Sequence, residues 1–254
     1  MYTRPPYPWM WYPYLLLSVT DPTSLRYVRS GVHSVIIDAG VHKVFYDMKL
    51  QEYPGGHKSW IHKVVSFYYT VKSRVREVYA VIPDYPSDYP HNPVQDNVER
   101  TIRNIEYALD NFSNVNWIIP LQGRPNSVKS VADTVERLKQ LGLLKSNYVA
   151  VAPTCVARSV DFLRRLAFTA RQLLRDKRIH MFGVTMRAWD KIDKYIDSTD
   201  TITTNFLCRQ LFGKMCTTMN EKTVGWKTFL DKLLEKKYLD EDTYRKALSP
   251  MYIS

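Results

Sequence analysis

Short apolar runs alternate with longer amphipathic stretches along most of the chain. The apolar runs predict strands at residues 14–19, 34–38, 78–84, 116–122, 147–152, 179–184 and 201–204. The stretches between them predict helices at 58–76, 94–111, 127–141, 157–176 and 187–196, because apolar residues recur there at helical spacing. Strands that are apolar throughout and alternate with helices are typical of a parallel sheet that is covered on both faces.

About seven such strand and helix units favour a TIM-barrel-like (β/α)8 fold. A doubly wound sheet is less favoured, because no Gly-rich phosphate loop follows an early strand. After about residue 206 the pattern is mainly helical, and VGWKTFLDKLLEKKYL is its clearest piece. We therefore expect one α/β barrel domain over residues 1–206, with an aromatic and proline-rich N-terminal arm. A helical extension over residues 207–254 should pack on the barrel.

The net charge of the chain indicates the kind of partner that it binds. The 254 residues carry a formal net charge of +11, and the 36 Lys and Arg are spread along the chain. This favours a polyanionic partner such as nucleic acid. No apolar run approaches the roughly 18 to 20 residues needed to cross a bilayer, and prolines and tyrosines break the apolar opening stretch. We expect a cytoplasmic protein that does not contact the membrane.

The cysteines and histidines do not indicate a metal site. Cys155, Cys208 and Cys216 form no CxxC pair, so the sequence signals neither a zinc site nor a disulfide framework. We expect reduced thiols, with Cys208 and Cys216 packed on one helix. The six histidines show no HxH or HExxH spacing, which makes metal chemistry an unfavoured reading.

Polar residues close several of the predicted strands. In a barrel the chemistry gathers at the carboxyl ends of the strands. The residues at these ends are Asp38, Asp84, Gln122, the turn Pro153 to Cys155, the segment Gly183 to Thr185, and Asp200. Each could instead begin a turn or cap a helix. Taken together, they predict a shared pocket at one end of the barrel.

Facing carboxylates in one pocket permit a recognisable reaction. One carboxylate can attack an electrophilic carbon while the other transfers protons, provided that their environments separate their pKa values. An anomeric carbon is such an electrophile, and glycosyl transfer uses this arrangement. The residue pattern does not specify the sugar or the leaving group.

Five motifs carry a resemblance to a known family. IIDAGVHKVF, VIPDYPSDYP, IIPLQGRPNSVKS, IHMFGV and IDSTDTITTNF follow one another between about residues 34 and 206. Their order and spacing resemble the tRNA-guanine transglycosylase superfamily, including its branch that inserts 7-deazaguanines into DNA.

The resemblance implies a pentosyltransferase that exchanges guanine for a 7-deazaguanine-type base. By this likeness Asp200 is the nucleophile that holds the ribose covalently, and Asp38 is the general acid/base. Asp84 and Gln122 would recognise the base, with Gly123 and Gly183 lining the same pocket. The implied partners are a nucleic acid, DNA or tRNA, and a free purine or 7-deazapurine base, and no cofactor is implied. The sequence leaves open whether the chain forms a homodimer.

The chain also departs from the family pattern. Its first motif reads Asp-Ala-Gly-Val, APTCVARS replaces the usual GG-x-x-x-GE segment, and the zinc motif is missing. One alternative is therefore a catalytically decayed barrel that acts as a nucleic-acid-binding or structural protein. Another is an unrelated barrel hydrolase that acts on small glycosides, which the basic charge does not favour.

Overall fold

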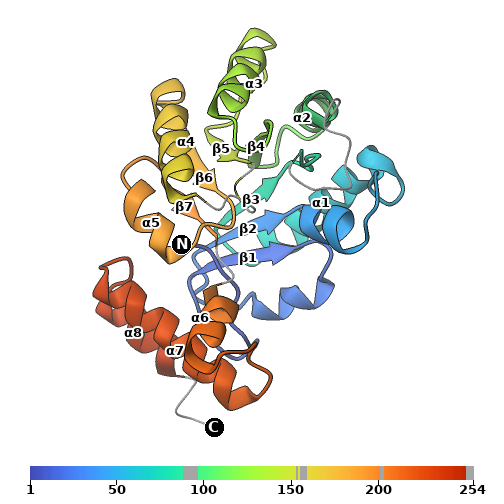
Figure 1. Cartoon of the computed structure of the whole chain (residues 1–254). Coiled ribbons are helices and arrows are strands. Elements are labelled where there is room, and N and C mark those ends of the chain that lie inside the picture. Colours follow the sequence, from blue (N-terminus) through green and yellow to red (C-terminus); the bar gives the residue numbers. More distant parts are fainter. Residues whose placement is uncertain (88–96, 153, 155–158, 201–202, 250–254) are drawn as a thin grey trace.

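A computed structural model describes residues 1–87, 97–152, 154, 159–200 and 203–249. Seven parallel strands form one sheet in which each strand pairs with the next along the chain (Figure 1). They are β1 (Tyr14–Ser18), β2 (Ser34–Asp38), β3 (Glu77–Val81), β4 (Trp117–Leu121), β5 (Tyr148–Val151), β6 (Arg178–Met181) and β7 (Ser198–Thr199). The predicted α/β barrel fold with a helical C-terminal segment is confirmed.

Helices connect the strands and surround the sheet (Figure 1). They are α1 (Gly56–Lys72), α2 (Asn97–Asn111), α3 (Val128–Gln140), α4 (Val160–Leu173) and α5 (Met186–Ile192), and a short 3-10 helix (Pro22–Tyr27) and a π-helix (His42–Asp47) follow β1 and β2. Serine side chains begin two of them: Ser127 accepts from the amide of Ser130, and Ser159 accepts from the amide of Phe162.

The last strand differs from the prediction. It lies at Ser198–Thr199 rather than at 201–204, and Thr203 already begins α6 (Thr203–Phe212). Residues 201 and 202 lie outside the described part of the chain. Threonines favour strands, but tertiary contacts decide which part of a short run pairs.

The N-terminal arm occupies the position of an eighth strand. Tyr2 bridges to Asp200 and Thr3 bridges to Leu15, both in parallel orientation. The amide of Tyr2 donates to the carbonyl of Thr199 at 2.7 Å, and the amide of Leu16 donates to the carbonyl of Thr3 at 3.1 Å. The arm therefore joins β7 to β1 through backbone hydrogen bonds.

Alternate strand residues belong to two separate cores. One core contains Val35, Ile37 and their equivalents together with apolar residues of the helices, so it lies between the sheet and the helices. The other contains the opposite strand positions, and its buried members are Tyr2, Ile36, Val81, Ile118, Tyr148 and Ala150. Because side chains alternate along a strand, this second cluster fills the interior of the barrel.

The C-terminal helices α7 (Met219–Glu235) and α8 (Glu241–Leu248) pack beside the barrel near β1 (Figure 1). Trp226 and Phe229 of α7 contact the ring of Tyr12 in the N-terminal arm, at centroid distances of 5.6 and 6.3 Å. The segment therefore shares the outer hydrophobic core with the barrel.

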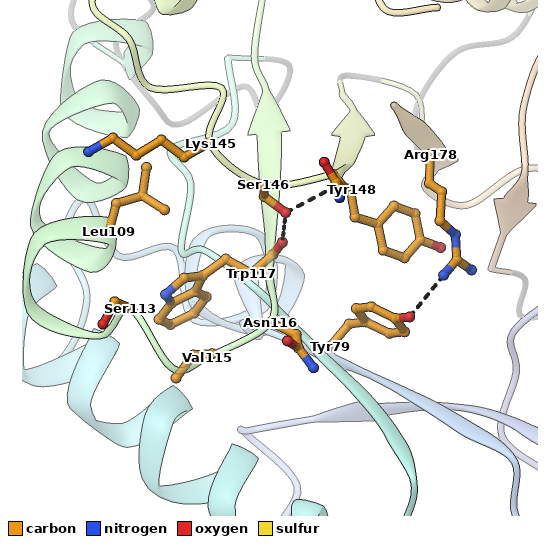
Figure 2. A pocket seen from close by; sticks show the side chains of 11 residues that line it. Tyr79, Leu109, Ser113, Val115, Asn116, Trp117, Lys145, Ser146, Tyr148 and Arg178 are labelled. Atoms are coloured by element: carbon orange, nitrogen blue, oxygen red, sulfur yellow. Dashed lines mark hydrogen bonds between the residues drawn. The ribbon is translucent and has the colours of Figure 1, made fainter. Parts of the chain in front are cut away.

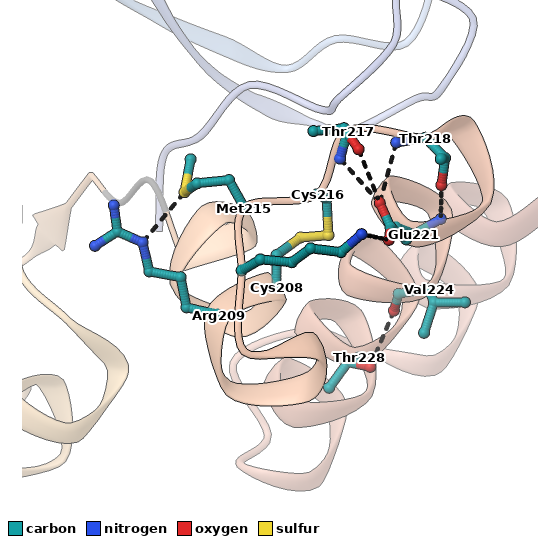
Figure 3. Close-up of a disulfide and its surroundings, with 10 residues drawn as sticks. Cys208, Arg209, Met215, Cys216, Thr217, Thr218, Glu221, Val224 and Thr228 are labelled. Carbon is teal, nitrogen blue, oxygen red and sulfur yellow. Dashed lines mark hydrogen bonds and ion pairs between the residues drawn. A yellow bond between two sulfur atoms is a disulfide. The ribbon is translucent and has the colours of Figure 1, made fainter.

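A disulfide joins Cys208 to Cys216, which corrects the expectation of reduced thiols on one helix (Figure 3). Cys208 lies in α6, but the helix ends at Phe212 and Gly213 turns the chain with a φ of +69°. The reversal returns Cys216 to the side of the helix, with the two Cα atoms 5.4 Å apart. The spacing of eight residues does not reveal this reversal.

Loss of the disulfide should destabilise the protein measurably. Closing a loop of this length lowers the entropy of the unfolded chain and so raises its free energy by about 2–3 kcal/mol. We expect Cys216→Ser to lower the Tm by about 5 °C in non-reducing buffer, measured by circular dichroism. The same comparison with reductant is the control, because both proteins then lack the disulfide and should melt alike. Equal Tm values for wild type and Cys216→Ser without reductant would contradict the expectation.

Candidate active site

Asp38 stands at the carboxyl end of β2, where the chain turns sharply. Gly40 has a φ of +76°, and a Cβ there would approach the Cγ2 of Thr20 to 2.3 Å. The indole of Trp60 in α1 donates to the carbonyl of Ala39 at 2.8 Å. The Gly40 amide and the hydroxyl of Ser18, the neighbour of Asp38 on β1, act to lower the pKa of the Asp38 carboxyl group. The small residues after Asp38 thus let the chain turn directly behind the carboxylate.

Asp200 lies directly after β7, and its carboxylate is held by two donors. The Nε2 of His180 lies 3.0 Å from Oδ1, and the amide of Gly183 donates to the same oxygen at 3.1 Å. His180 is fully buried, whereas the Asp200 side chain remains 12% exposed. Oδ2 accepts no hydrogen bond within the residues that the structure describes.

A chain of hydrogen bonds continues from Asp200 into the barrel. The Nδ1 of His180 lies 2.7 Å from the hydroxyl of Ser198, which lies 2.5 Å from the hydroxyl of Tyr148. An ionised carboxylate can only accept, so Nε2 of His180 is the donor to Asp200. When Nδ1 carries no proton, it accepts from Ser198, and Ser198 accepts from Tyr148. Every donor in this buried chain has an acceptor, which fixes the ring of His180 beneath Asp200.

The electrostatics connect Asp38 with Asp200. Burial, and then the nearby Asp200 carboxylate, raise the pKa of Asp38 to about 6, although its hydrogen bonds from Gly40 and Ser18 oppose the shift. The two carboxylates therefore interact at the same end of the barrel. A carboxyl group with this pKa exchanges protons near neutral pH, as a general acid/base must.

Asp84 and Gln122 meet beside this pair. The side-chain amide of Gln122 donates to Oδ2 of Asp84, and both residues are buried. Tyr53 donates to the backbone carbonyl of Asp84 at 2.7 Å. Burial raises the pKa of Tyr53 well above its ordinary value, and the charges of Asp84 and Asp38 add to the shift. Tyr53 thus lies near both carboxylates.

The loop that carries Asp84 is fastened by α2. Asn104 donates to the carbonyl of Pro83 at 2.7 Å, and the hydroxyl of Thr101 accepts from the amide of Tyr85 at 2.9 Å. The Oε1 of Gln122 is buried and has no hydrogen-bond partner within the described ranges. A buried acceptor without a partner is costly, so this atom is suited to receive a donor from a bound molecule.

The remaining predicted residues have local roles. A Cβ on Gly123 would lie 2.7 Å from the Cγ2 of Val131, so the close approach of α3 requires this glycine. Gly183 has a φ of +62° and supplies the amide that Asp200 accepts. Thr154 donates to the carbonyl of Phe182 at 2.6 Å and ties the ends of β5 and β6 together. Pro153 and Cys155 of the same predicted turn lie outside the described residues.

Four further residues of the site were not predicted from the sequence: His180, Ser198, Tyr148 and Ser18. A signal existed for His180, because it is a histidine inside an otherwise apolar strand, where it faces inward. The serines and Tyr148 give no such signal, since their hydroxyl groups meet only after the barrel has closed.

The described residues contain no group of three or more His, Cys, Asp and Glu side chains that could hold a metal ion. In the same part of the chain, no helix is long and apolar enough to cross a membrane.

Comparisons with known proteins reveal likeness of fold alone. No protein-family model matches the chain, and no curated protein matches it. Among solved structures it is similar to QR15, an aldolase, with 11% identity and a TM-score of 0.44 over 80% of this chain and 96% of that one. A monomeric dihydrodipicolinate synthase variant has 14% identity and a TM-score of 0.43, over 94% of this chain and 86% of that chain.

The carboxyl transferase domain of pyruvate carboxylase from Rhizobium etli has 11% identity and a TM-score of 0.45, over 94% of this chain and 34% of that one. None of these three is a tRNA-guanine transglycosylase. Likeness at this level says nothing about substrate or reaction.

The raised pKa of Asp38 predicts a pH-dependent effect of its replacement. The folded state holds the proton more tightly than the unfolded chain does, so Asp38 destabilises the fold progressively as the pH rises from about 3.8, and this cost is fully developed above about pH 6. Asp38→Asn keeps an acceptor for Gly40 and Ser18 but removes the charge. We expect this variant to be more stable than the wild type by roughly 1–3 kcal/mol at pH 7.5.

Urea unfolding at two pH values measures this difference. The gain should shrink towards zero at pH 4, where Asp38 is protonated in the folded protein and close to half protonated in the unfolded chain. Asp47→Asn, an exposed carboxylate beyond the same strand, is the control. A gain for Asp38→Asn that is equal at both pH values would show that charge is not its cause.

Proposed function

We propose that this protein is a nucleic-acid base-exchange glycosyltransferase. It would replace guanine by a 7-deazaguanine-type base through a covalent aspartyl-ribosyl intermediate. The observation that supports this most is the pair Asp38 and Asp200, two interacting carboxylates at the carboxyl end of the barrel with different surroundings. The pKa of Asp38 is shifted towards neutrality, and the carboxylate of Asp200 is fixed by two donors on Oδ1.

In the first step the free oxygen of Asp200 attacks C1′ of the target nucleotide. The bond from C1′ to the base nitrogen breaks, and the electron pair of that bond leaves with the base. Protonated Asp38 gives its proton to the departing base and becomes ionised. His180 and Gly183 hold Oδ1 of Asp200, which orients Oδ2 for attack.

The second step reverses the first with a different base. Ionised Asp38 removes a proton from the incoming base, and the nitrogen of that base attacks C1′. The bond between C1′ and Asp200 breaks and restores the carboxylate. No electrons are gained or lost, so the exchange requires no redox cofactor.

Asp84 and Gln122 are suited to recognise the base. A carboxylate accepts hydrogen bonds from ring and exocyclic N–H groups, which guanine and 7-deazaguanines present. The buried Oε1 of Gln122 offers a further acceptor. The net charge of +11 favours a polyanionic substrate, and the ordered motifs from IIDAGVHKVF to IDSTDTITTNF support a transglycosylase.

An exchange assay with two variants tests the proposed roles. The protein is incubated with guanine-containing tRNA or with DNA, each with labelled guanine or labelled 7-deazaguanine. We expect incorporation into one polymer and an adduct that survives SDS. Asp200→Ala should lose the adduct and at least about 1,000-fold of the rate, since it lacks the nucleophile. Asp38→Asn should lose about 100-fold or more.

The control is Asp133→Asn, because Asp133 is an exposed carboxylate of α3 that pairs with Lys129 outside the site. Incorporation that persists in Asp200→Ala would refute the nucleophile assignment. Tight, salt-sensitive binding of nucleic acid without incorporation or adduct would instead support the decayed barrel that binds nucleic acid.

His180 should act as a positioning residue for Asp200. Loss of a charge-assisted hydrogen bond corresponds to about 10- to 100-fold. We expect His180→Ala to lower kcat for exchange by that factor with little change in KM for the polymer, because His180 does not contact the substrate. His180→Gln can still donate and should recover part of the loss. A rise in KM without a fall in kcat would contradict this role.

A further inference from the structure

A cavity opens at the opposite end of the barrel from Asp38 and Asp200. Its volume is about 520 Å³, and it lies at the amino ends of β4, β5 and β6 beside the loop after α2 (Figure 2). Small-molecule sites typically measure 300–1,000 Å³. The proposed reaction uses none of the residues that line this cavity, except that Tyr148 begins the hydrogen-bond chain towards Asp200.

The charged side chains that line the cavity are all basic. Its eleven residues include Lys145 and Arg178 but no Asp or Glu. Neither cation has an ion-pair partner among the residues that the structure describes, and both are exposed. A cavity with two unpaired positive charges and no acidic lining residue favours an anion.

Arg178 is held in a fixed position. Its guanidinium donates to the hydroxyl of Tyr79 at 2.8 Å and lies 4.6 Å from the ring centre of Tyr148 and 5.3 Å from that of Tyr79. A guanidinium has five N–H donors, so most of them stay available. Figure 2 shows Arg178 beside the two tyrosine rings, with Lys145 at another side of the cavity. Arginine presented in this way is suited to bind a phosphate through two donors.

Aromatic and amide groups form part of the remaining wall, together with Leu109, Val115 and two serines. Tyr79 and Tyr148 meet edge to face at 5.1 Å, and Trp117 lies at the start of β4. Asn116 uses its amide nitrogen to donate to the carbonyl of Val78 at 3.1 Å, which leaves its Oδ1 to accept. Asn147 is exposed at the rim. Aromatic rings stack with bases, and amide groups pair with their edges.

We propose that this cavity is a second binding site, which takes a nucleoside monophosphate unit. The phosphate binds Arg178, Lys145 adds positive charge from another side of the cavity, and the base packs against the half-buried Tyr79 within reach of Asn116. The unit has two sources: a free nucleotide, or one nucleotide of a single-stranded nucleic acid. This inference does not depend on the proposed exchange reaction, because a binding protein without activity would keep the same site.

Isothermal titration of the full chain tests the site with GMP, UMP and inorganic phosphate as separate probes. We expect both nucleotides to bind at least tenfold more tightly than phosphate does. Arg178→Gln should weaken their binding by about tenfold or more, and Lys145→Ala by a few-fold. Lys139→Ala, an exposed cation of α3 paired with Glu136, is the matched control and should bind as the wild type does.

A second pair of variants separates this cavity from the candidate active site. Asp200→Asn and Gln122→Leu change the carboxyl end of the barrel, so they should leave nucleotide affinity at the amino end unchanged. Weakening by these variants rather than by Arg178→Gln would assign the nucleotide to the active site and refute the proposal. Equal Tm values for wild type and Arg178→Gln exclude a folding defect.

A single-stranded oligonucleotide distinguishes the two sources. If free nucleotides do not bind at millimolar concentration but Arg178→Gln weakens oligonucleotide binding tenfold, the site takes its nucleotide within a polymer. If the free nucleotides bind and Arg178→Gln affects them alone, the site takes a free ligand. The proposal is wrong if neither probe binds, or if Arg178→Gln and Lys145→Ala bind both as the wild type does.

Discussion

The closure of the barrel by the N-terminal arm is the constraint on which the rest of the structure depends. Tyr2 and Thr3 supply the backbone groups that β7 and β1 would otherwise leave unpaired. The arm bridges to Asp200 itself, while β1 brings Ser18 beside Asp38. The approach of the two carboxylates therefore follows from a ring of parallel strands whose last gap is filled by a few residues from the start of the chain.

Side chains at the inner strand positions connect the amino end of the barrel with its carboxyl end. Most of them are apolar, but Tyr148, Ser198 and His180 form a satisfied polar chain through the interior. In a medium of low dielectric such a chain is rigid, because breaking any bond leaves a buried group unpaired. Tyr148 meets Arg178 at the amino end, and His180 meets Asp200 at the carboxyl end. The same inner layer thus supports a cationic cavity at the amino end of the barrel and an acidic site at its carboxyl end.

Different surroundings give the two carboxylates different chemistry. Asp38 is desolvated next to a like charge, and its pKa rises towards neutrality. Asp200 receives two hydrogen bonds on one oxygen, and these fix the orientation of its carboxylate. Such a division lets one group transfer protons while the other acts as a carboxylate, which is how paired acids share a reaction in many enzymes.

The sequence by itself determined the strand and helix order, because burial on both faces makes each parallel strand a continuous apolar run. It also located Asp38, Asp84, Gln122 and Asp200, since a carboxylate or amide that ends an apolar strand can be recognised from the order of residues alone. Tertiary structure alone decided the rest. Pairing of Tyr2 with Asp200 joins residues from opposite parts of the chain, and the disulfide of Cys208 depends on a reversal at Gly213. The lone inward His180 gained its role only when closure placed a carboxylate and a serine within hydrogen-bond reach, because such contacts depend on three-dimensional distance and not on spacing along the chain.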